Sequence, residues 1–158
     1  MLALKRNGPL RWFLHAPVYI YRWHLGSLLG KRFLLLTHIG RHTGLRRQTV
    51  LELMEYREKG PEAVVMSGFG PNSDWLRNIQ ARSGEEVDIG SRHFPATHRF
   101  LGDEEAMAVV KSYERRNRLV APLVRDVLSR LLGWQYSGSE ADRRRLIEQL
   151  PLIAFRPR

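Results

Sequence analysis

Residues 33–47 read FLLLTHIGRHTGLRR, and this stretch decides the fold that we expect. An apolar run, residues 33–36, leads into the polar turn GRHTG at residues 40–44, and a second alternating run begins at Arg46. Two strand-like runs around a turn bounded by glycines are typical of a β-hairpin. The turn offers backbone N–H groups, the Thr43 hydroxyl and nearby guanidinium groups, which together could cradle a phosphate. The alternative is an ordinary exposed hairpin whose basic side chains are solvated.

The composition is that of an ordinary globular protein. The chain has 158 residues, of which 43% are apolar, and this is enough for one domain with its own core. It contains no cysteine, which excludes disulfides, thiolate nucleophiles and cysteine-ligated metals. The sequence shows neither the apolar run of a signal peptide nor the roughly 20 apolar residues of a spanning helix. We therefore expect a single domain over residues 1–158 and a cytoplasmic location.

The charge is placed unevenly along the chain. The formal net charge is +10, and residues 1–51 carry nine basic side chains and no acidic one, whereas the remainder carries 17 basic and 16 acidic side chains. This one-sided distribution predicts an anionic partner. The candidates are a phosphorylated cofactor, an anionic lipid surface and nucleic acid. Nucleic acid is the least favoured, because the charge gathers at one turn and one helix without a known binding module.

Residues 10–30 (LRWFLHAPVYIYRWHLGSLLG) are rich in aromatic side chains and mostly helical in their spacing. Pro17 would kink this helix or begin its second half. One interpretation is an interfacial helix with weak attachment to an anionic membrane, since Trp12 and Trp23 stand among basic residues. We favour a helix that packs over the open end of a barrel, because its apolar residues are too broadly spread for one clean apolar face.

Apolar and alternating runs separated by turns predict strands and helices over the rest of the chain. The strands are expected at residues 33–39, 46–57, 63–67, 86–89, 92–101 and 152–155, and the helices at residues 74–82, 103–117, 119–132 and 140–149. We expect Ser73 or Asp74 to cap the first of these helices and Pro95 to interrupt the fifth strand. This order of elements predicts an α+β fold built on a small barrel.

Four motifs in this order carry a resemblance to a known family. They are G-R-x-[ST]-G-x-x-R at residues 40–47, a strand ending in Ser67 before a glycine-containing loop, W-x-x-N at Trp75 and Asn78, and a C-terminal strand at residues 150–157. With these motifs the chain resembles the deazaflavin-dependent nitroreductases, which are split-barrel proteins related to the flavin-binding pyridoxamine-phosphate oxidases. The resemblance implies a split β-barrel, like that of FMN-binding proteins, with an N-terminal helix and C-terminal helices.

The resemblance also implies a cofactor and its site. The cofactor would be the deazaflavin coenzyme F420, in preference to FMN, and its polyanionic tail suits the basic N-terminal third. By position, the resemblance assigns cofactor binding to Arg41, His42, Thr43, Gly44, Arg46, Arg47, Gly68, Trp75 and Asn78. Family members often have lysine where this chain has His42, whose charge depends on pH. The implied activity is hydride transfer from reduced F420 to a small acceptor, such as a quinone, an enone or a nitroaromatic compound.

Two hydroxyl groups are the candidates for catalytic roles. Ser67 could hydrogen-bond an acceptor oxygen at a strand end, and Tyr136 could donate a proton or form a pocket wall. The alternatives are a turn role for Ser67 and simple packing for Tyr136 and Trp75. No metal site is expected, since His38 and His42 straddle a turn without supporting ligands. The competing functions are a cofactor carrier without turnover and an FMN-binding relative, and the oligomeric state is left open.

Overall fold

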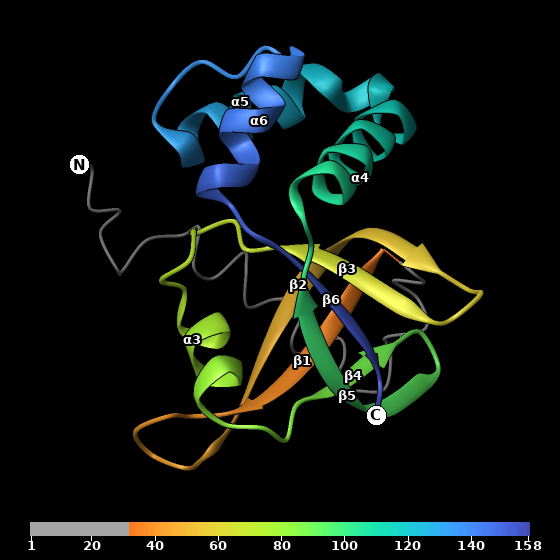
Figure 1. Ribbon diagram of the computed structural model, residues 1–158, viewed down its shortest axis with the longest axis vertical. Helices are drawn as coiled ribbons and strands as arrows, with labels where there is room; N and C mark the ends of the chain where they lie inside the picture. Colours follow the sequence, from red (N-terminus) through yellow and green to blue (C-terminus); the bar gives the residue numbers. More distant parts are fainter. Residues whose placement is uncertain (1–31) are drawn as a thin grey trace.

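The computed structural model describes residues 32–158, and its centre is a closed barrel of six antiparallel strands (Figure 1). The strands are β1 (Phe33–Ile39), β2 (Arg46–Arg57), β3 (Glu62–Met66), β4 (Glu86–Ile89), β5 (Arg92–Phe100) and β6 (Leu152–Pro157). Their order around the barrel is β1-β2-β3-β6-β5-β4, and β1 closes the barrel by pairing with β4. The predicted α+β split-barrel fold is thus confirmed. The helix predicted at residues 10–30 lies outside the described residues.

Helices occupy two places relative to the barrel (Figure 1). The first helix, α3 (Asp74–Ala81), joins β3 to β4, and its apolar side chains are part of the barrel core. The others form a layer beyond one end of the barrel, namely α4 (Asp103–Arg116), α5 (Ala121–Leu132) and α6 (Glu140–Gln149). This layer is an insertion between β5 and β6, and its two ends meet where Leu101 N donates to Leu152 O at 3.0 Å. Within residues 32–158, no helix is long and apolar enough to cross a membrane.

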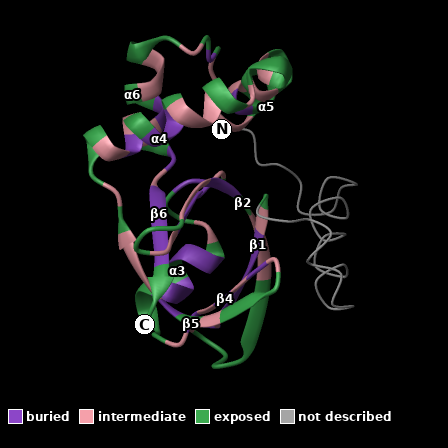
Figure 2. Cartoon of the chain, turned by 90° about the vertical axis from the view of Figure 1, so that its right-hand side faces the viewer, coloured by how far each residue is buried: buried purple, intermediate pink, exposed green. Residues whose placement is uncertain are grey.

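Two apolar cores follow from this arrangement, and both are seen as purple segments in Figure 2. The first fills the barrel, where Leu34, Leu36 and Phe155 pack with Trp75 and Ile79 of α3. The second lies between the outer face of the barrel and the helical layer. Its fully buried members include Val64, Val109, Val110, Tyr136 and Leu146. The barrel core therefore holds α3 at a fixed place against the strands.

The element boundaries differ from the predictions at a few positions. Strand β5 is continuous through Pro95, because Ala96 N donates to Glu85 O at 2.9 Å and Pro95 O accepts from Arg158 N at 2.9 Å. The helix predicted at residues 119–132 is divided into a 3-10 turn, Arg118–Val120, and α5. Proline fits the first turn of a helix, where its missing N–H is not needed, so Pro122 lies in the first turn of α5 and does not continue a longer helix.

A network of ion pairs joins the barrel to α4. Glu105 accepts from Arg99 and from Arg57 at 2.7 Å each, and Arg99 also contacts Glu62 at 2.9 Å. Hydrogen bonds from Arg99 and Arg57 lower the pKa of Glu105 to about 2. A carboxyl group whose pKa is lower in the folded state stabilises the fold at pH values above its unfolded-state pKa.

We expect Glu105→Gln to lower the free energy of unfolding at pH 7 by on the order of 1 kcal/mol, since the pairs are partly exposed. The difference between wild type and variant should shrink as the pH falls from 4.5 towards 2, where the folded wild type becomes protonated. Urea unfolding of wild type and variant at several pH values measures this difference in the free energy of unfolding. Glu104→Gln is the matched control, because Glu104 is exposed and makes only a longer pair with Arg144 at 3.3 Å.

Candidate functional site

A groove of about 390 Å³ opens where β1 and β2 meet the start of α3. It is lined by His38, Arg47, Gln48, Thr49, Phe69, Asn72, Ser73, Asp74 and Trp75. A groove of this size suits a small molecule, and its wall mixes an aromatic side chain, hydroxyl groups and a guanidinium. We call it the basic groove, since Arg47 carries its positive charge.

The turn at residues 40–44 lies beside this groove but is not an open cradle of N–H groups. Gly44 N donates to Gly40 O at 2.8 Å, Gly40 N to Leu45 O at 2.8 Å, and Leu45 N to Thr43 Oγ1 at 3.3 Å. A Cβ atom on Gly40 would lie 2.5 Å from Thr43 Oγ1, so a side chain at this position would force Thr43 to move. The prediction that the N–H groups are free is therefore wrong for these three. His42, Thr43 and Gly44 form the exposed tip of the turn.

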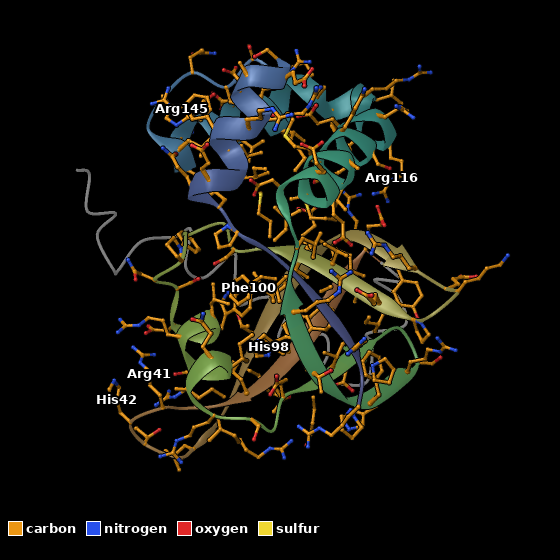
Figure 3. The ribbon with its side chains drawn as sticks, in the orientation of Figure 1. Arg41, His42, His98, Phe100, Arg116 and Arg145 are labelled. Carbon is orange, nitrogen blue, oxygen red and sulfur yellow. The ribbon has the colours of Figure 1, made fainter. Side chains whose placement is uncertain are left out.

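Arg41 lies mostly buried between the turn and α3 (Figure 3). Its guanidinium forms an ion pair with Asp74 at 3.0 Å and donates from Nη1 to Asn78 Oδ1 at 2.9 Å, and its backbone N–H donates to the same oxygen at 3.1 Å. These contacts fasten the turn to the helix. Arg41 does not line the basic groove, and its guanidinium is held against α3 by these contacts.

Arg46 and Arg47 point in different directions, because neighbouring side chains on a strand alternate between its faces. Arg46 reaches Glu86 of β4 through two hydrogen bonds of 2.8 and 3.2 Å, so its guanidinium is already paired. The side chain of Arg47 lines the basic groove and has no ion-pair or hydrogen-bond partner among residues 32–158. Of the three predicted guanidinium ligands, Arg47 is thus the one that remains available to an anion in the groove.

Asn78 connects the turn to His38. Because Asn78 Oδ1 accepts from Arg41, its amide nitrogen faces His38, and Asn78 Nδ2 lies 3.1 Å from His38 Nδ1. An amide nitrogen can only donate, so Nδ1 of His38 accepts and its proton is on Nε2. Burial, aided by the charge of Arg47, lowers the pKa of His38 to about 4, which keeps the ring neutral at pH 7.

His38 is the site residue that the sequence reasoning missed. It was considered only as a metal ligand, yet it is 4% exposed and lines the basic groove. A signal was present in the sequence. His38 alternates with Leu34 and Leu36, which are core residues of the barrel, so it belongs to the inward-facing row of β1. A polar residue at the end of an inward-facing row, next to a turn, is a candidate for a binding or catalytic site.

Trp75 and Ser73 reach the groove, whereas Ser67 does not. Trp75 lines the groove with one side and packs on Phe155 of the barrel core with the other. Ser67 is fully buried and donates to Gly70 O at 2.6 Å, and its hydroxyl also contacts that of Ser73. Ser73 occupies the N-cap position of α3, as predicted, but its hydroxyl donates to Gly70 O at 2.9 Å and accepts no hydrogen bond from the first turn of the helix. Ser73, and not Ser67, thus lines the basic groove.

Tyr136 and Gly68 lie away from the basic groove. Tyr136 is buried in the core beneath the helices, and its hydroxyl donates to Glu114, which also pairs with Arg143 at 2.8 Å. Gly68 lies in the loop after β3, where it faces Leu131 of α5. The structure therefore does not bring Tyr136 together with Ser73, Trp75 and Arg47.

We expect Tyr136→Phe to leave turnover within about twofold of wild type, because a proton donor must lie within hydrogen-bond reach of the reacting group. The free energy of unfolding should fall by about 1–3 kcal/mol, since Glu114 loses a buried hydrogen bond. Steady-state kinetics and urea unfolding of the same preparation measure both effects. A fall in turnover of tenfold or more with normal stability would instead restore Tyr136 as a catalytic residue.

Comparisons with known proteins identify the family of the chain. The family model described as F420H(2)-dependent quinone reductase matches residues 20–121. The chain belongs to this family. As a member of the F420H(2)-dependent quinone reductase family, the protein is an F420-dependent oxidoreductase, which confirms the family, the enzyme class and the cofactor that were predicted. A search of curated proteins found no match.

Solved structures support the fold of this F420H(2)-dependent quinone reductase family member. An F420-H2 dependent reductase named FDR-A has 17% identity and a TM-score of 0.51, and the match covers 80% of this chain and 95% of that one. Atu2129, a protein of unknown function from Agrobacterium tumefaciens, has 13% identity and a TM-score of 0.50, and the match covers 90% of this chain and 55% of that one.

Proposed function

We propose that the basic groove holds F420, with the anionic tail at Arg47 and the ring against Trp75. The observation that carries the proposal is Arg47, which lines the groove without a partner among residues 32–158. A charged donor of this kind contributes about 1.5–3 kcal/mol to a hydrogen bond with an anion. The donors and the aromatic face of the groove thus fit both parts of the coenzyme.

Reduced F420 supplies the hydride when it is bound, and the protein contributes orientation and electrostatics. Arg41 and Asn78 position the turn and the ring of His38 through the hydrogen bonds described above. His38 Nε2 is a donor in the wall of the groove, whereas the hydroxyl proton of Ser73 is already donated to Gly70 O. A donor that is already in place stabilises negative charge as it develops on an acceptor oxygen. His38 therefore replaces Ser67 and Tyr136 as the proposed hydrogen-bond donor to the acceptor.

The acceptor is a small molecule, and we propose a quinone, an enone or a nitroaromatic compound. Each of these gains negative charge on an oxygen as it takes a hydride, which suits a wall that holds neutral donors. Because its pKa is lowered to about 4, His38 is neutral at pH 7 and offers one hydrogen bond to the acceptor oxygen, from Nε2.

Titration of the purified protein with oxidised F420 and, separately, with FMN tests the cofactor site. We expect saturable binding of F420 and none of FMN at equal concentration. Incubation with reduced F420 and a panel of quinone, enone and nitroaromatic acceptors, followed by the absorbance of the coenzyme, then tests turnover. Binding of F420 without oxidation by any acceptor would indicate a carrier protein, and failure to bind F420 would contradict the proposal.

A further inference from the structure

Two arginine side chains lie against the turn at residues 40–44, one at each of its glycines. A Cβ atom on Gly40 would lie 3.4 Å from Arg47 Nε, and a Cβ atom on Gly44 would lie 3.6 Å from Arg82 Nη1. Like Arg47, Arg82 makes no side-chain hydrogen bond or ion pair among residues 32–158, and it is exposed. The turn therefore carries a second available guanidinium, which belongs to none of the four motifs in the sequence.

The end of α3 places Arg82 beside the turn. Arg82 is the C-cap residue of this helix, and its backbone is extended, with φ −140° and ψ 127°, so the chain leaves the helix here. A Cβ atom on Gly84 would lie 3.6 Å from Ile39 Cγ1, which places the chain after α3 against the end of β1. At the start of α3, Asp74 pairs with Arg41 of the turn at 3.0 Å (Figure 3). The turn thus lies along α3 from the first residue of the helix to its C-cap.

The charge around the turn is mostly positive. Residues 40–47 hold three arginines and no acidic residue, and residues 74–82 hold two arginines and one aspartate. That aspartate, Asp74, is paired with Arg41, and Arg46 is paired with Glu86. Within residues 32–158, no carboxylate lies within ion-pair distance of Arg47 or Arg82. An anion that binds over the turn therefore gains the attraction of both charges without displacing a carboxylate.

Thr43, which lies between the two glycines, offers a third donor. Its Oγ1 accepts from Leu45 N at 3.3 Å, and its hydroxyl proton is donated to no residue in the part of the chain that the structure describes. The backbone N–H groups of Gly40 and Gly44 are used within the turn. An anion over the turn would therefore be held by side chains, with charge-assisted hydrogen bonds from the arginines.

We propose that Arg82 is a second anion-binding residue of the coenzyme site, at the other glycine of the turn from Arg47. The ligand is a chain with at least two separate anionic groups, and the polyanionic tail of F420 is such a chain. One group would bind at Arg47, and the next at Thr43 and Arg82. This inference rests on the proposed function, because it extends the tail site from the basic groove over the turn. FMN has a single phosphate group, which can occupy only one of the two positions, so Arg82 favours F420 over FMN.

The variant Arg82→Gln tests this site by equilibrium titration with two ligands. One is F420, and the other is the deazaflavin that has the ring and the ribityl chain but no anionic tail. We expect the dissociation constant for F420 to rise about tenfold, the low end for a charge-assisted hydrogen bond, because the side chain is exposed. Binding of the ligand without a tail should be unchanged, since it has no group for Arg82 to hold.

Arg77→Gln is the matched control for this titration. It removes the same charge from an exposed position of the same helix, and the Arg77 side chain makes no hydrogen bond or ion pair with the turn. We expect its dissociation constant for F420 to stay within about twofold of wild type, because salt screens a distant exposed charge. Equal losses in Arg77→Gln and Arg82→Gln would reduce the effect to net charge and overturn the inference.

The double variant Arg47→Ala/Arg82→Gln shows whether the two arginines hold separate groups. Independent contacts have additive free energies, so the two losses should multiply to about a hundredfold or more. A double variant that binds F420 no more weakly than Arg47→Ala alone would place both arginines on one anionic group, and this would overturn the inference.

The melting temperature separates binding from a purely structural role. A cation at the C-terminus of a helix also complements the helix dipole. If that were the whole role of Arg82, Arg82→Gln would have a lower melting temperature and an unchanged dissociation constant for F420, which would overturn the inference. The proposed function would remain intact in that case, provided that Arg47→Ala still binds F420 more weakly. Failure of the wild type to bind F420 would contradict the proposed function itself, and this inference with it.

Discussion

Replacing Arg47 with alanine should weaken the binding of F420 about tenfold or more, since a charge-assisted contact of roughly 1.5–3 kcal/mol is lost. The side chain lines the basic groove and has no hydrogen-bond or ion-pair partner among residues 32–158, so its removal breaks no such bond within that part of the chain. The melting temperature should therefore stay within a degree or so of wild type. Equilibrium titration with F420 and differential scanning calorimetry measure the two quantities.

The neighbouring residue provides a matched control for this experiment. Arg46→Ala removes the same charge from the adjacent position, but Arg46 is paired with Glu86 outside the groove. A general effect of net charge would weaken binding equally in both variants, and it would fade with added salt. A specific contact would weaken it mainly in Arg47→Ala, and Arg47→Lys should be intermediate, because lysine keeps the charge but lacks the planar fork. Equal losses in the two alanine variants would remove Arg47 from the proposed site.

Replacing Asn78 with leucine should have the largest effect on stability, a loss of about 2–4 kcal/mol in the free energy of unfolding. The leucine has a similar volume, but it offers no acceptor to the two Arg41 donors and no donor to His38. Buried donors without an acceptor cost far more than the same donors in water. For a domain of this size, the melting temperature should fall by about 5–10 °C.

Two further measurements show whether Asn78 acts through His38. In wild type, nitrogen NMR should detect the proton of His38 on Nε2 and a pKa near 4. In Asn78→Leu, the proton should distribute over both ring nitrogens, and F420 should bind more weakly because the turn is released. Gln80→Leu is the control, since it also replaces a side-chain amide with leucine, but at an exposed position of α3. A fully stable Asn78→Leu protein with an unchanged His38 tautomer would contradict this network.

Most of the strands could be predicted because their signals are local. Strands β1, β2 and β4 have the predicted bounds, since each is an apolar or alternating run that ends at a turn. Pro95 was misleading, because a missing N–H breaks a strand only if that N–H is needed for the ladder. The neighbouring Ala96 N and the carbonyl of Pro95 make the bonds that keep β5 continuous, and their partners are Glu85, just before β4, and Arg158, just after β6.

The candidate site was harder to predict than the fold, because the availability of each of its side chains depends on partners far along the chain. The sequence places Arg41, Arg46 and Arg47 in one motif, but Arg41 pairs with Asp74 and Arg46 with Glu86. No local pattern distinguishes a paired guanidinium from one that is available. The same holds for Ser67 and Ser73, whose order of exposure depends on how the loop after β3 folds back on Gly70.

The helical layer leaves the barrel and returns to it at a single point, where Leu101 and Leu152 share a hydrogen bond. Doubling the length of a loop whose ends are already held together costs only about 0.6 kcal/mol. Mutation can therefore lengthen or shorten the connections between these helices without shifting the register of any barrel strand, as long as the side chains packed on Met54 and Val64 are kept. The turn at residues 40–44 lies at the opposite end of the barrel (Figure 1). Under the proposed function, such changes in the helical layer leave the coenzyme site in the basic groove unaltered.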